Sequence, residues 1–447
     1  MALVIRNGRV CDPSQRLDAV MDVLVVDGRI AALGPNLEAP PDAETVDATG
    51  LVVAPGFIDV HVHLREPGFT AKETIATGAR AAVAGGFTAV CCMANTLPVN
   101  DSPVVTRYIL DRAREAAACR VYPIGAVTKG LQGEALADIG GMAAAGIVAL
   151  SDDGHSIANA NLLRRALEYA SDFGLPVVDH CENRDLAAGG VVNEGFVSTQ
   201  LGVRGMTRAA EEVDVARDVV LASVTGAHIH IAHLSTAGSL ELVRRAQAEG
   251  LRVTCEVTPH HLTLDESAVL TFGTLAKMNP PLRTAADVEA LLEGVADGTV
   301  TCIATDHAPH TALEKDQVLT HAPFGVVGLE CAVSLMLDQL YWRQGISLMR
   351  VIELFSTGPA RAFNLPGGTL QIGRPADMTI LDIHRETVVD VRRWASKARN
   401  SPFDGWRLKG APVMTLVGGV CVSAGVAAEE ATFWPPRETV AARPRTG

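Results

Sequence analysis

The chain has 447 residues, of which 48% are hydrophobic and 20% charged, and its formal net charge is −13 with only six lysines. Such a composition is typical of an ordered globular protein, and the acidic balance disfavours binding to nucleic acid or to an anionic membrane surface. The length suffices for one large α/β domain with a smaller second domain.

Targeting signals and membrane spans are not predicted. The amino terminus lacks the charged and then apolar segments of a signal peptide, and no apolar run reaches the length of a membrane span. The nine cysteines are scattered without C-x-x-C pairs, and several lie inside apolar strands. Together these features predict a cytoplasmic protein with reduced, buried thiols.

The two ends of the chain are rich in predicted β-strand. The segments "LVIRNGRV" (3–10) and "VLVVDGRIAALG" (23–34) read as short strands broken by hairpin turns at Asn-Gly and Asp-Gly. The same pattern returns in 368–383 and 411–425. We therefore expect residues 1–54 and 366–447 to meet in one small β-sandwich domain.

The middle of the chain, residues 55–365, alternates between strands and helices. Amphipathic helices are predicted near 102–118, 161–174, 238–250 and 285–298, often closed by a glycine. Apolar strands are predicted near 57–63, 87–93, 121–127, 146–151, 176–180, 228–233, 251–257 and 299–305. Eight such units favour a (β/α)₈ barrel, and the absence of G-x-G-x-x-G after an early strand argues against a doubly wound nucleotide-binding sheet.

Residues of the metal-ligand type follow five of these strands. In a (β/α)₈ barrel the carboxyl ends of the strands share one rim, so these side chains are expected to converge. They are His61, His63, an aspartate in "SDDG" (Asp152 or Asp153), His180, His233 and Asp306.

Imidazole and carboxylate groups suit zinc and related divalent ions, and six such groups favour two metals sharing a bridging water. His61, His63 and Arg65 alternate along the first strand, which would point all three to one side. Strand position alone does not decide between Asp152 and Asp153 as the bridging ligand. Other histidines are assigned structural roles or none: His155, His228, His230, His260, His261, His307, His321 and His384.

With these motifs in hand, the chain resembles the dihydroorotases of the longer bacterial class, within the amidohydrolase superfamily. The resemblance runs over essentially the whole chain. Its motifs occur in the family's order: "DVHVHLREPG", "MANTLPVND", "SDDG", "KMNPPLR", "ATDHAPH" and "APFG".

The resemblance implies reversible cyclisation of N-carbamoyl-L-aspartate to L-dihydroorotate in pyrimidine (UMP) biosynthesis. It implies two Zn²⁺ ions with a hydroxide between them, one ion held by His61, His63, Asp153 and Asp306, the other by Asp153, His180 and His233. Many relatives bridge the metals with a carboxylated lysine, but no lysine occurs between Lys129 and Lys277, so Asp153 takes that place. Asp306 is implied as the general acid and base.

The resemblance also implies the contacts of the substrate. Arg65, Asn95 and His310 would hold its free carboxylate, for which a forked guanidinium is well shaped. The full set of implied substrate-binding residues is His63, Arg65, Asn95, Asn279, His310, Phe324 and Gly325.

Two other functions are weighed against this one. An allantoinase or hydantoinase is disfavoured because such relatives typically carry the lysine bridge and lack an arginine matching Arg65. A non-catalytic dihydroorotase-like partner of aspartate transcarbamoylase is disfavoured because all six predicted metal ligands are present. The sequence leaves open a homodimer and a complex with aspartate transcarbamoylase.

Overall fold

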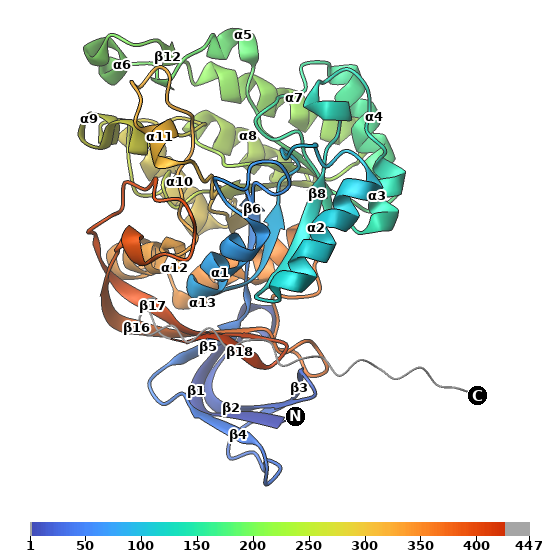
Figure 1. Cartoon of the computed structure of the whole chain (residues 1–447), viewed down its shortest axis with the longest axis vertical. Coiled ribbons are helices and arrows are strands. Elements are labelled where there is room, and N and C mark those ends of the chain that lie inside the picture. Colours follow the sequence, from blue (N-terminus) through green and yellow to red (C-terminus); the bar gives the residue numbers. More distant parts are fainter. Residues whose placement is uncertain (1, 425–447) are drawn as a thin grey trace.

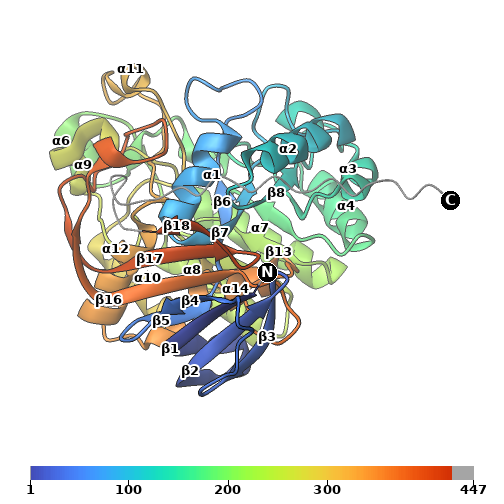
Figure 2. The same ribbon diagram turned by 60° about the horizontal axis from the view of Figure 1, so that its bottom comes forward.

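The computed structural model describes residues 2–424 and consists of a helix-covered barrel with a β-sheet domain beneath it (Figure 1). The amino-terminal strands and the last strands lie together on the lower side of the barrel (Figure 2). Within residues 2–424, none of the helices combines the length and the hydrophobicity that a bilayer crossing requires.

The barrel sheet contains eight parallel strands that neighbour one another in chain order. They are β6 (Phe57–Val62), β7 (Phe87–Cys92), β8 (Arg120–Gly125), β9 (Ala149–Leu150), β10 (Val177–Asp179), β13 (Ile229–Ile231), β14 (Val253–Val257) and β15 (Cys302–Ile303). A parallel bridge between Val62 and His307 joins the first strand to the segment after the last one, with the His63 amide donating to the His307 carbonyl at 2.9 Å. The predicted (β/α)₈ barrel is confirmed.

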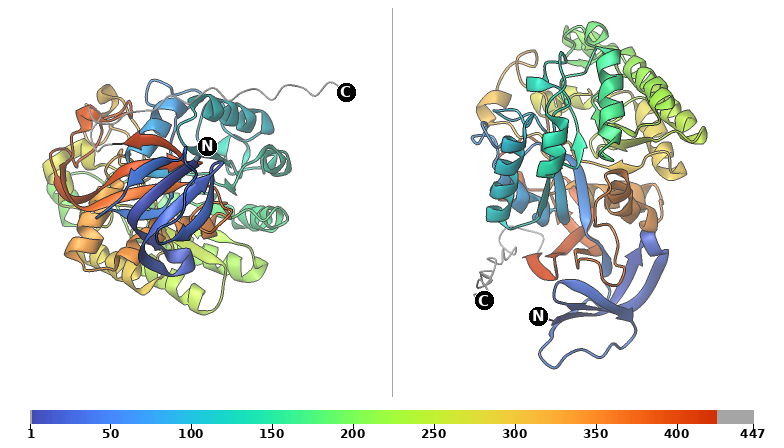
Figure 3. Two further views of the ribbon diagram at one scale, coloured as in Figure 1. Left: turned by 90° about the horizontal axis from the view of Figure 1, so that it is seen from below. Right: turned by 90° about the vertical axis from the view of Figure 1, so that its right-hand side faces the viewer.

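Helices surround this sheet, as the view from below shows (Figure 3). The main ones are α1 (Ile75–Ala84), α2 (Pro103–Ala116), α3 (Ile139–Ala145), α4 (Ala160–Ser171), α7 (Ala209–Thr225), α8 (Ala237–Ala248), α10 (Ala285–Asp297), α13 (Leu348–Phe355) and α14 (Thr357–Ala362). Local sequence fixes their ends: Thr284 forms a capping box at the start of α10, and Gly298, with φ 94°, ends it in a left-handed conformation. All four predicted helical stretches contain a helix.

Shorter elements build the loops above the barrel and between its helices. They are α5 (Arg184–Ala187), β11 (Val192–Asn193), α6 (Phe196–Leu201), β12 (Gly205–Met206), α9 (Ala268–Phe272), α11 (Ala312–Lys315) and α12 (Ala332–Met336).

The β-rich domain is built from both ends of the chain, as predicted. Its strands are β1 (Ala2–Asp12), β2 (Leu17–Val26), β3 (Arg29–Gly34), β4 (Glu44–Asp47), β5 (Val52–Pro55), β16 (Met378–Val388), β17 (Arg407–Val417) and β18 (Val420–Ala424). They form one continuous sheet in which β5 pairs with β1 on one side and β16 on the other. Buried residues from both ends, such as Ile5 and Ile380, share a separate hydrophobic core. Residues 425–447 of the predicted domain lie outside the described residues.

One of the two predicted hairpin turns is wrong. Asp27 and Gly28 do connect β2 to β3, both with positive φ. Asn7 and Gly8 instead form a bulge inside β1, which keeps pairing with β2 on either side. The Asp22 carboxylate accepts the Asn7 amide at 3.0 Å, so a side chain of the neighbouring strand satisfies the group that the bulge leaves unpaired.

The connection between β16 and β17 returns from the β domain to the barrel. Glu330, just before α12, accepts the Ala395 and Ser396 amides at 3.1 Å each. Glu73, just before α1, accepts the Ser396 hydroxyl and the Lys397 amide. Two carboxylates of the barrel therefore hold one turn of this connection.

Burial of Glu330, with Glu73 nearby, raises the pKa of the Glu330 carboxyl to about 8. Between the ordinary pKa of 4.5 and about 8, the folded protein holds a proton that the unfolded chain releases. The stabilisation that this proton gives is complete below pH 4.5, falls as pH rises, and is lost above about 8.

Glu330→Gln removes this titration. We expect the difference in the free energy of unfolding, variant minus wild type, to increase by about 1 to 3 kcal/mol from about pH 6 to about pH 9, because only wild type loses this stabilisation. Urea unfolding at the two pH values measures it, with the exposed Glu293→Gln as control. A difference between Glu330→Gln and wild type that does not change with pH would contradict the assignment.

Candidate metal centre

Asp153 lies at the centre of a ring of four histidines at the upper rim of the barrel. Its carboxylate oxygens are 3.4 Å from His61 Nε2, 3.5 Å from His63 Nε2, 3.5 Å from His180 Nδ1 and 3.6 Å from His233 Nε2. The four rings come from segments at the carboxyl ends of three different strands, β6, β10 and β13. The barrel thus brings together groups that are up to 172 residues apart in the chain.

Asp306 completes the cluster from the segment after β15. Its Oδ1 atom is 3.0 Å from His63 Nε2 and 3.5 Å from His61 Nε2. Two sets of potential ligands, each with all its ligand atoms within 4.8 Å of one another, share His61: His61 with His63 and Asp306, and His61 with Asp153 and His233. The structure therefore brings all six sequence-predicted metal ligands together.

Unsatisfied atoms in this cluster fit a bound cation. His61 Nε2 and Asp153 Oδ1 are buried and have no hydrogen-bond partner among the described residues. His61 Nδ1 lies 2.6 Å from the Glu256 carboxylate, so in a neutral ring Nδ1 carries the proton and Nε2 presents a lone pair to Asp153. Lone pairs that face each other at this distance repel unless a cation lies between them, which is how histidine and aspartate bind divalent metals.

The pKa shifts within the cluster also indicate that its carboxylates require a compensating positive charge. Burial raises the pKa of Asp153, but the surrounding histidines, His61 first, bring it well below its usual value. Burial lowers the pKa of His180, but Asp153 and Glu182 outweigh it and raise the value to about 10. In the absence of metal the histidines would take up protons to compensate the buried carboxylates, and a bound metal would replace those protons.

The neighbouring aspartate, Asp152, accepts hydrogen bonds from the backbone instead. Its Oδ1 accepts the amides of Val127 and Thr128 at 2.8 and 3.0 Å, and its other oxygen accepts the Thr128 hydroxyl. These bonds hold the end of β8 against the segment after β9. Of the two candidates, only Asp153 faces the histidines.

Glu256, on β14, supports two of the histidines from inside the barrel and was not foreseen from the sequence. Oε1 accepts His61 Nδ1–H at 2.6 Å and the His233 amide at 3.2 Å, and Oε2 lies 3.2 Å from His230 Nε2. The side chain is fully buried. Inside "VTCEV" it reads as a strand residue, and only its charge within an apolar run could have drawn attention to it.

Several residues of the site have a strained backbone. Arg65, His233 and Asp306 all have positive φ, at 61°, 29° and 47°, a region that side chains other than glycine seldom adopt. Such strain persists where the surrounding structure enforces it, and it is common at functional sites. At all three positions the strand has ended and the chain is turning, which aims the side chain over the barrel mouth.

The position of Arg65 does not follow from the strand alternation that was used to predict its direction. β6 ends at Val62, because the chain then pairs with His307 and turns, so the strand alternation of His61, His63 and Arg65 does not extend to the arginine. Its Nε donates to the Pro309 carbonyl at 3.2 Å, and one terminal nitrogen lies 3.5 Å from His310 Nε2.

Three basic side chains form a corner beside the histidine cluster. His310 lies between Arg65 and Lys72, whose Nζ is 3.4 Å from His310 Nδ1. Burial and these two cations lower the pKa of His310 to about 3, so its ring is neutral. Lys72, which the sequence did not single out, also pairs with Glu314 at 2.7 Å. Asn95 contacts the histidine cluster, since its Oδ1 accepts His63 Nδ1–H at 2.9 Å.

The opposite side of the site contains Asn279. Its amide nitrogen donates to Glu182 at 2.6 Å and lies 3.3 Å from His180 Nε2, while its buried Oδ1 has no partner among the described residues. The Asn279 side chain is therefore held in place with one acceptor still free.

Phe324 and Gly325 lie in the segment that follows His310. Asn400, in the β16–β17 connection, donates to the carbonyls of Gly325 and Ala308 at 3.1 Å each, and its Oδ1 accepts the His310 amide. A side chain at Gly325, with φ 133°, would come within 2.8 Å of Ala308. The Phe324 ring lies 4.5 Å from Lys277 Nζ. Asn400 thus positions His310 and Gly325 together, although nothing in the sequence relates these residues.

Most histidines without a predicted role lie outside the cluster. His307 turns to Glu73 at 3.4 Å, and His261 binds the Thr258 hydroxyl and the Pro280 carbonyl. His260 is the nearest exception: it is buried, and its Nε2 has no partner among the described residues. His228 and His230 lie below the cluster and share the Thr254 hydroxyl.

Comparisons with known proteins point to one family. A family model described as dihydro-orotase-like matches residues 50–239. A dihydroorotase of Syntrophotalea carbinolica is 52% identical over 94% of this chain and 98% of its own length, and one of Solibacter usitatus is 52% identical over 94% and 97%. Among solved structures, the L-hydantoinase (dihydropyrimidinase) of Arthrobacter aurescens has a TM-score of 0.86 at 26% identity, covering 96% of this chain and 98% of its own.

The contacts of Glu256 predict an effect on metal binding. Glu256→Gln keeps the shape but removes the charge that orients His61, so we expect metal affinity to fall by about 10- to 100-fold. Competition with a chelator of known affinity measures it, and the exposed Glu249→Gln is the matched control. Equal affinities in wild type and Glu256→Gln would show that the contact has no such role.

Proposed function

The chain belongs to the dihydroorotase family, and on that premise we propose that it catalyses the reversible cyclisation of N-carbamoyl-L-aspartate to L-dihydroorotate in pyrimidine biosynthesis. One observation carries the proposal: a buried ring of histidines around Asp153 adjoins the basic corner of Arg65, His310 and Lys72. The first arrangement suits hydrolysis of an amide, and the second suits an anionic substrate.

We propose that the cluster holds two Zn²⁺ ions. His61, His63, Asp153 and Asp306 would hold one, and Asp153, His180 and His233 the other. When bound, zinc lowers the pKa of water to near neutrality and polarises a carbonyl oxygen. The support is the pair of buried, unpartnered atoms on His61 and Asp153. Lys277 and Lys315, the nearest lysines downstream of Asp153, donate to backbone carbonyls instead, in keeping with an aspartate as the bridging group.

Asp306 is proposed as the general acid and base. Burial raises its pKa, but His63 and His61 outweigh that effect and lower it to about 2, so the carboxylate is charged and ready to accept a proton at neutral pH. In the hydrolytic direction it would take a proton from the attacking water and deliver it to the leaving ring nitrogen. In the biosynthetic direction it would remove a proton from the carbamoyl nitrogen. The backbone strain at Asp306 helps to fix its carboxylate at the mouth of the barrel.

The substrate would lie between the basic corner and Asn279. Arg65 and His310, with Asn95, are proposed to bind the free carboxylate, and the free Oδ1 of Asn279 to accept a ring N–H. His63, Phe324 and the backbone of Gly325 would complete the binding site. The neutral His310 ring can donate one hydrogen bond without adding charge.

The wider setting is also proposed. We infer a cytoplasmic enzyme with the domain limits 1–54, 55–365 and 366–447, which acts as a homodimer or together with aspartate transcarbamoylase. The chemistry of the reaction requires a partner reaction that supplies N-carbamoyl-L-aspartate.

Metal analysis combined with a substrate panel tests the function. We expect zinc in the purified protein and turnover of L-dihydroorotate at least about 100-fold faster, as kcat/KM, than of hydantoin or allantoin. The same ratio tests the alternative that the chain is a hydantoinase, which the similar solved hydantoinases raise. Faster turnover of hydantoin, or a metal-free protein of full activity, would refute the proposal.

Asp306→Asn tests the acid and base role. Because the amide cannot accept the proton, we expect kcat to fall by about 10²- to 10⁴-fold while zinc content stays close to that of wild type. Steady-state kinetics and metal analysis on the same samples provide both numbers. Turnover within a factor of about 3 of wild type would exclude the role.

Arg65→Lys tests the carboxylate contact. Lysine keeps the charge but loses the forked geometry, so we expect KM for dihydroorotate to rise by about tenfold or more with metal content unchanged. Lys72→Arg, in the same corner, is a control that retains its charge. An unchanged KM in Arg65→Lys would place the substrate carboxylate elsewhere.

A further inference from the structure

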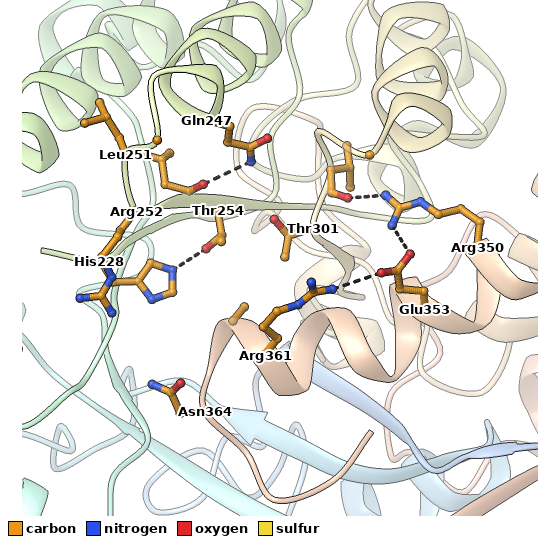
Figure 4. A pocket seen from close by; sticks show the side chains of 15 residues that line it. His228, Gln247, Leu251, Arg252, Thr254, Thr301, Arg350, Glu353, Arg361 and Asn364 are labelled. Carbon is orange, nitrogen blue, oxygen red and sulfur yellow. Dashed lines mark hydrogen bonds and ion pairs between the residues drawn. The ribbon is translucent and has the colours of Figure 1, made fainter. Parts of the chain in front are cut away.

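A second cavity opens at the opposite end of the barrel from the metal cluster. It has a volume of about 620 Å³ and lies where β13, β14 and β15 begin, bordered by α13 and α14 (Figure 4). Cavities of this size hold small molecules of the size of a nucleotide or cofactor. Residues at the amino ends of barrel strands normally serve stability, so the chemistry of this lining calls for a separate explanation.

The charged lining of this cavity is predominantly positive. Three arginines, Arg252, Arg350 and Arg361, face one acidic residue, Glu353. This leaves two positive charges in one hollow of a protein whose net charge is −13 and which has only six lysines. A concave basic surface on an acidic protein concentrates anions.

Part of the cavity wall is rigid before any ligand binds. Arg350 donates to the carbonyls of Val295 and Val300 at 2.9 and 2.6 Å and to Glu353 at 2.9 Å. Glu353 also accepts Arg361 at 3.1 Å. The single acidic group of the lining is therefore already neutralised by two arginines, and it does not oppose an anion.

Arg252 is the arginine left for a ligand. Its side chain is exposed and, within residues 2–424, makes no hydrogen bond or ion pair; its backbone carbonyl accepts the Ile229 amide at 3.1 Å. It lies beside His228 at one end of the cavity, while Arg350 and Glu353 lie toward the other end (Figure 4). Gln247, Thr301 and Asn364 add polar groups to the lining.

A chain of hydrogen bonds fixes His228 in this place. Its Nε2 lies 2.8 Å from the Thr254 hydroxyl, which lies 2.8 Å from His230 Nδ1. His230 continues to Glu256 at 3.2 Å, and Glu256 to His61 of the metal cluster at 2.6 Å. With Nε2 engaged, Nδ1 of His228 is the ring atom that can contact a ligand next to Arg252.

We propose that this cavity is a second ligand site, which binds a phosphate monoester of about the size of a nucleoside monophosphate, with the phosphate on Arg252 and the rest of the molecule along Gln247 and Thr301. A phosphate monoester carries nearly two negative charges at neutral pH, so the Arg252 guanidinium and the net positive charge of the lining attract it more strongly than they attract a single carboxylate. A guanidinium binds phosphate through two parallel hydrogen bonds.

Calorimetric titration of the metal-loaded enzyme tests the site, with uridine 5′-monophosphate, inorganic phosphate and malate as probes. We expect the nucleotide to bind once per chain, more tightly than phosphate and malate. Arg252→Ala should weaken the binding by about tenfold or more, because a charged hydrogen bond is lost, and Arg252→Glu should abolish it.

Two variants distinguish this cavity from the metal cluster. Arg165→Ala, which removes an exposed arginine of α4 outside both sites, and Arg65→Ala, at the rim, should both leave nucleotide binding unchanged. Binding that survives in Arg252→Glu, or is lost in Arg65→Ala, would overturn the proposal. So would malate binding as tightly as the nucleotide, or no measurable heat with the nucleotide at about 5 mM.

Discussion

The compensation of buried negative charge at the barrel mouth is the constraint on which the rest of this structure depends. Asp153 and Asp306 lie with Glu256 in a region almost closed to water, where uncompensated carboxylates would be very costly. No lysine or arginine makes an ion pair with Asp153 or Asp306 among the described residues; the neighbours are histidines. Histidines compensate charge only when they bind protons or a metal, so this site is built for a cation that can be exchanged.

The fold meets this constraint by fixing the directions in which the side chains at the barrel mouth point. Short parallel strands end at one rim, and the backbone then turns through positive φ at Arg65, His233 and Asp306. Glu256 ties His61 and the His233 backbone to the barrel interior, while Asp152 ties the end of β8 to the segment that carries Asp153. The side chains proposed as metal ligands are thus held by groups that lie outside the cluster, which sets their geometry in advance.

Sequence reasoning found the residues whose chemistry is unusual for their position and missed those that act through partners. The alternation of His61 and His63 on an apolar strand, together with the family motifs, predicted the residues that the structure brings together in the histidine cluster. Strand position did not decide between Asp152 and Asp153, because β9 is only two residues long and both aspartates follow it; only the family resemblance favoured Asp153. Asn400 and Lys72 were missed because their roles depend on contacts with His310, which is 90 residues from Asn400 and 238 from Lys72.

The same limits explain the error in the β domain. An Asn-Gly pair predicts a turn only if the strands on either side can pair with each other, and in β1 both halves pair with β2 instead. Local sequence sets which backbone conformations are easy, whereas the partner strand decides which one is used. Side chains in the barrel interior also depend on partners that the sequence does not reveal.

Four polar residues that look isolated in the sequence form one hydrogen-bonded column between the lower end of the barrel and His61. They are His228, Thr254, His230 and Glu256. In such a column each buried polar group is hydrogen-bonded only through its neighbours. A change at either end therefore alters the hydrogen bonding of every group in the column.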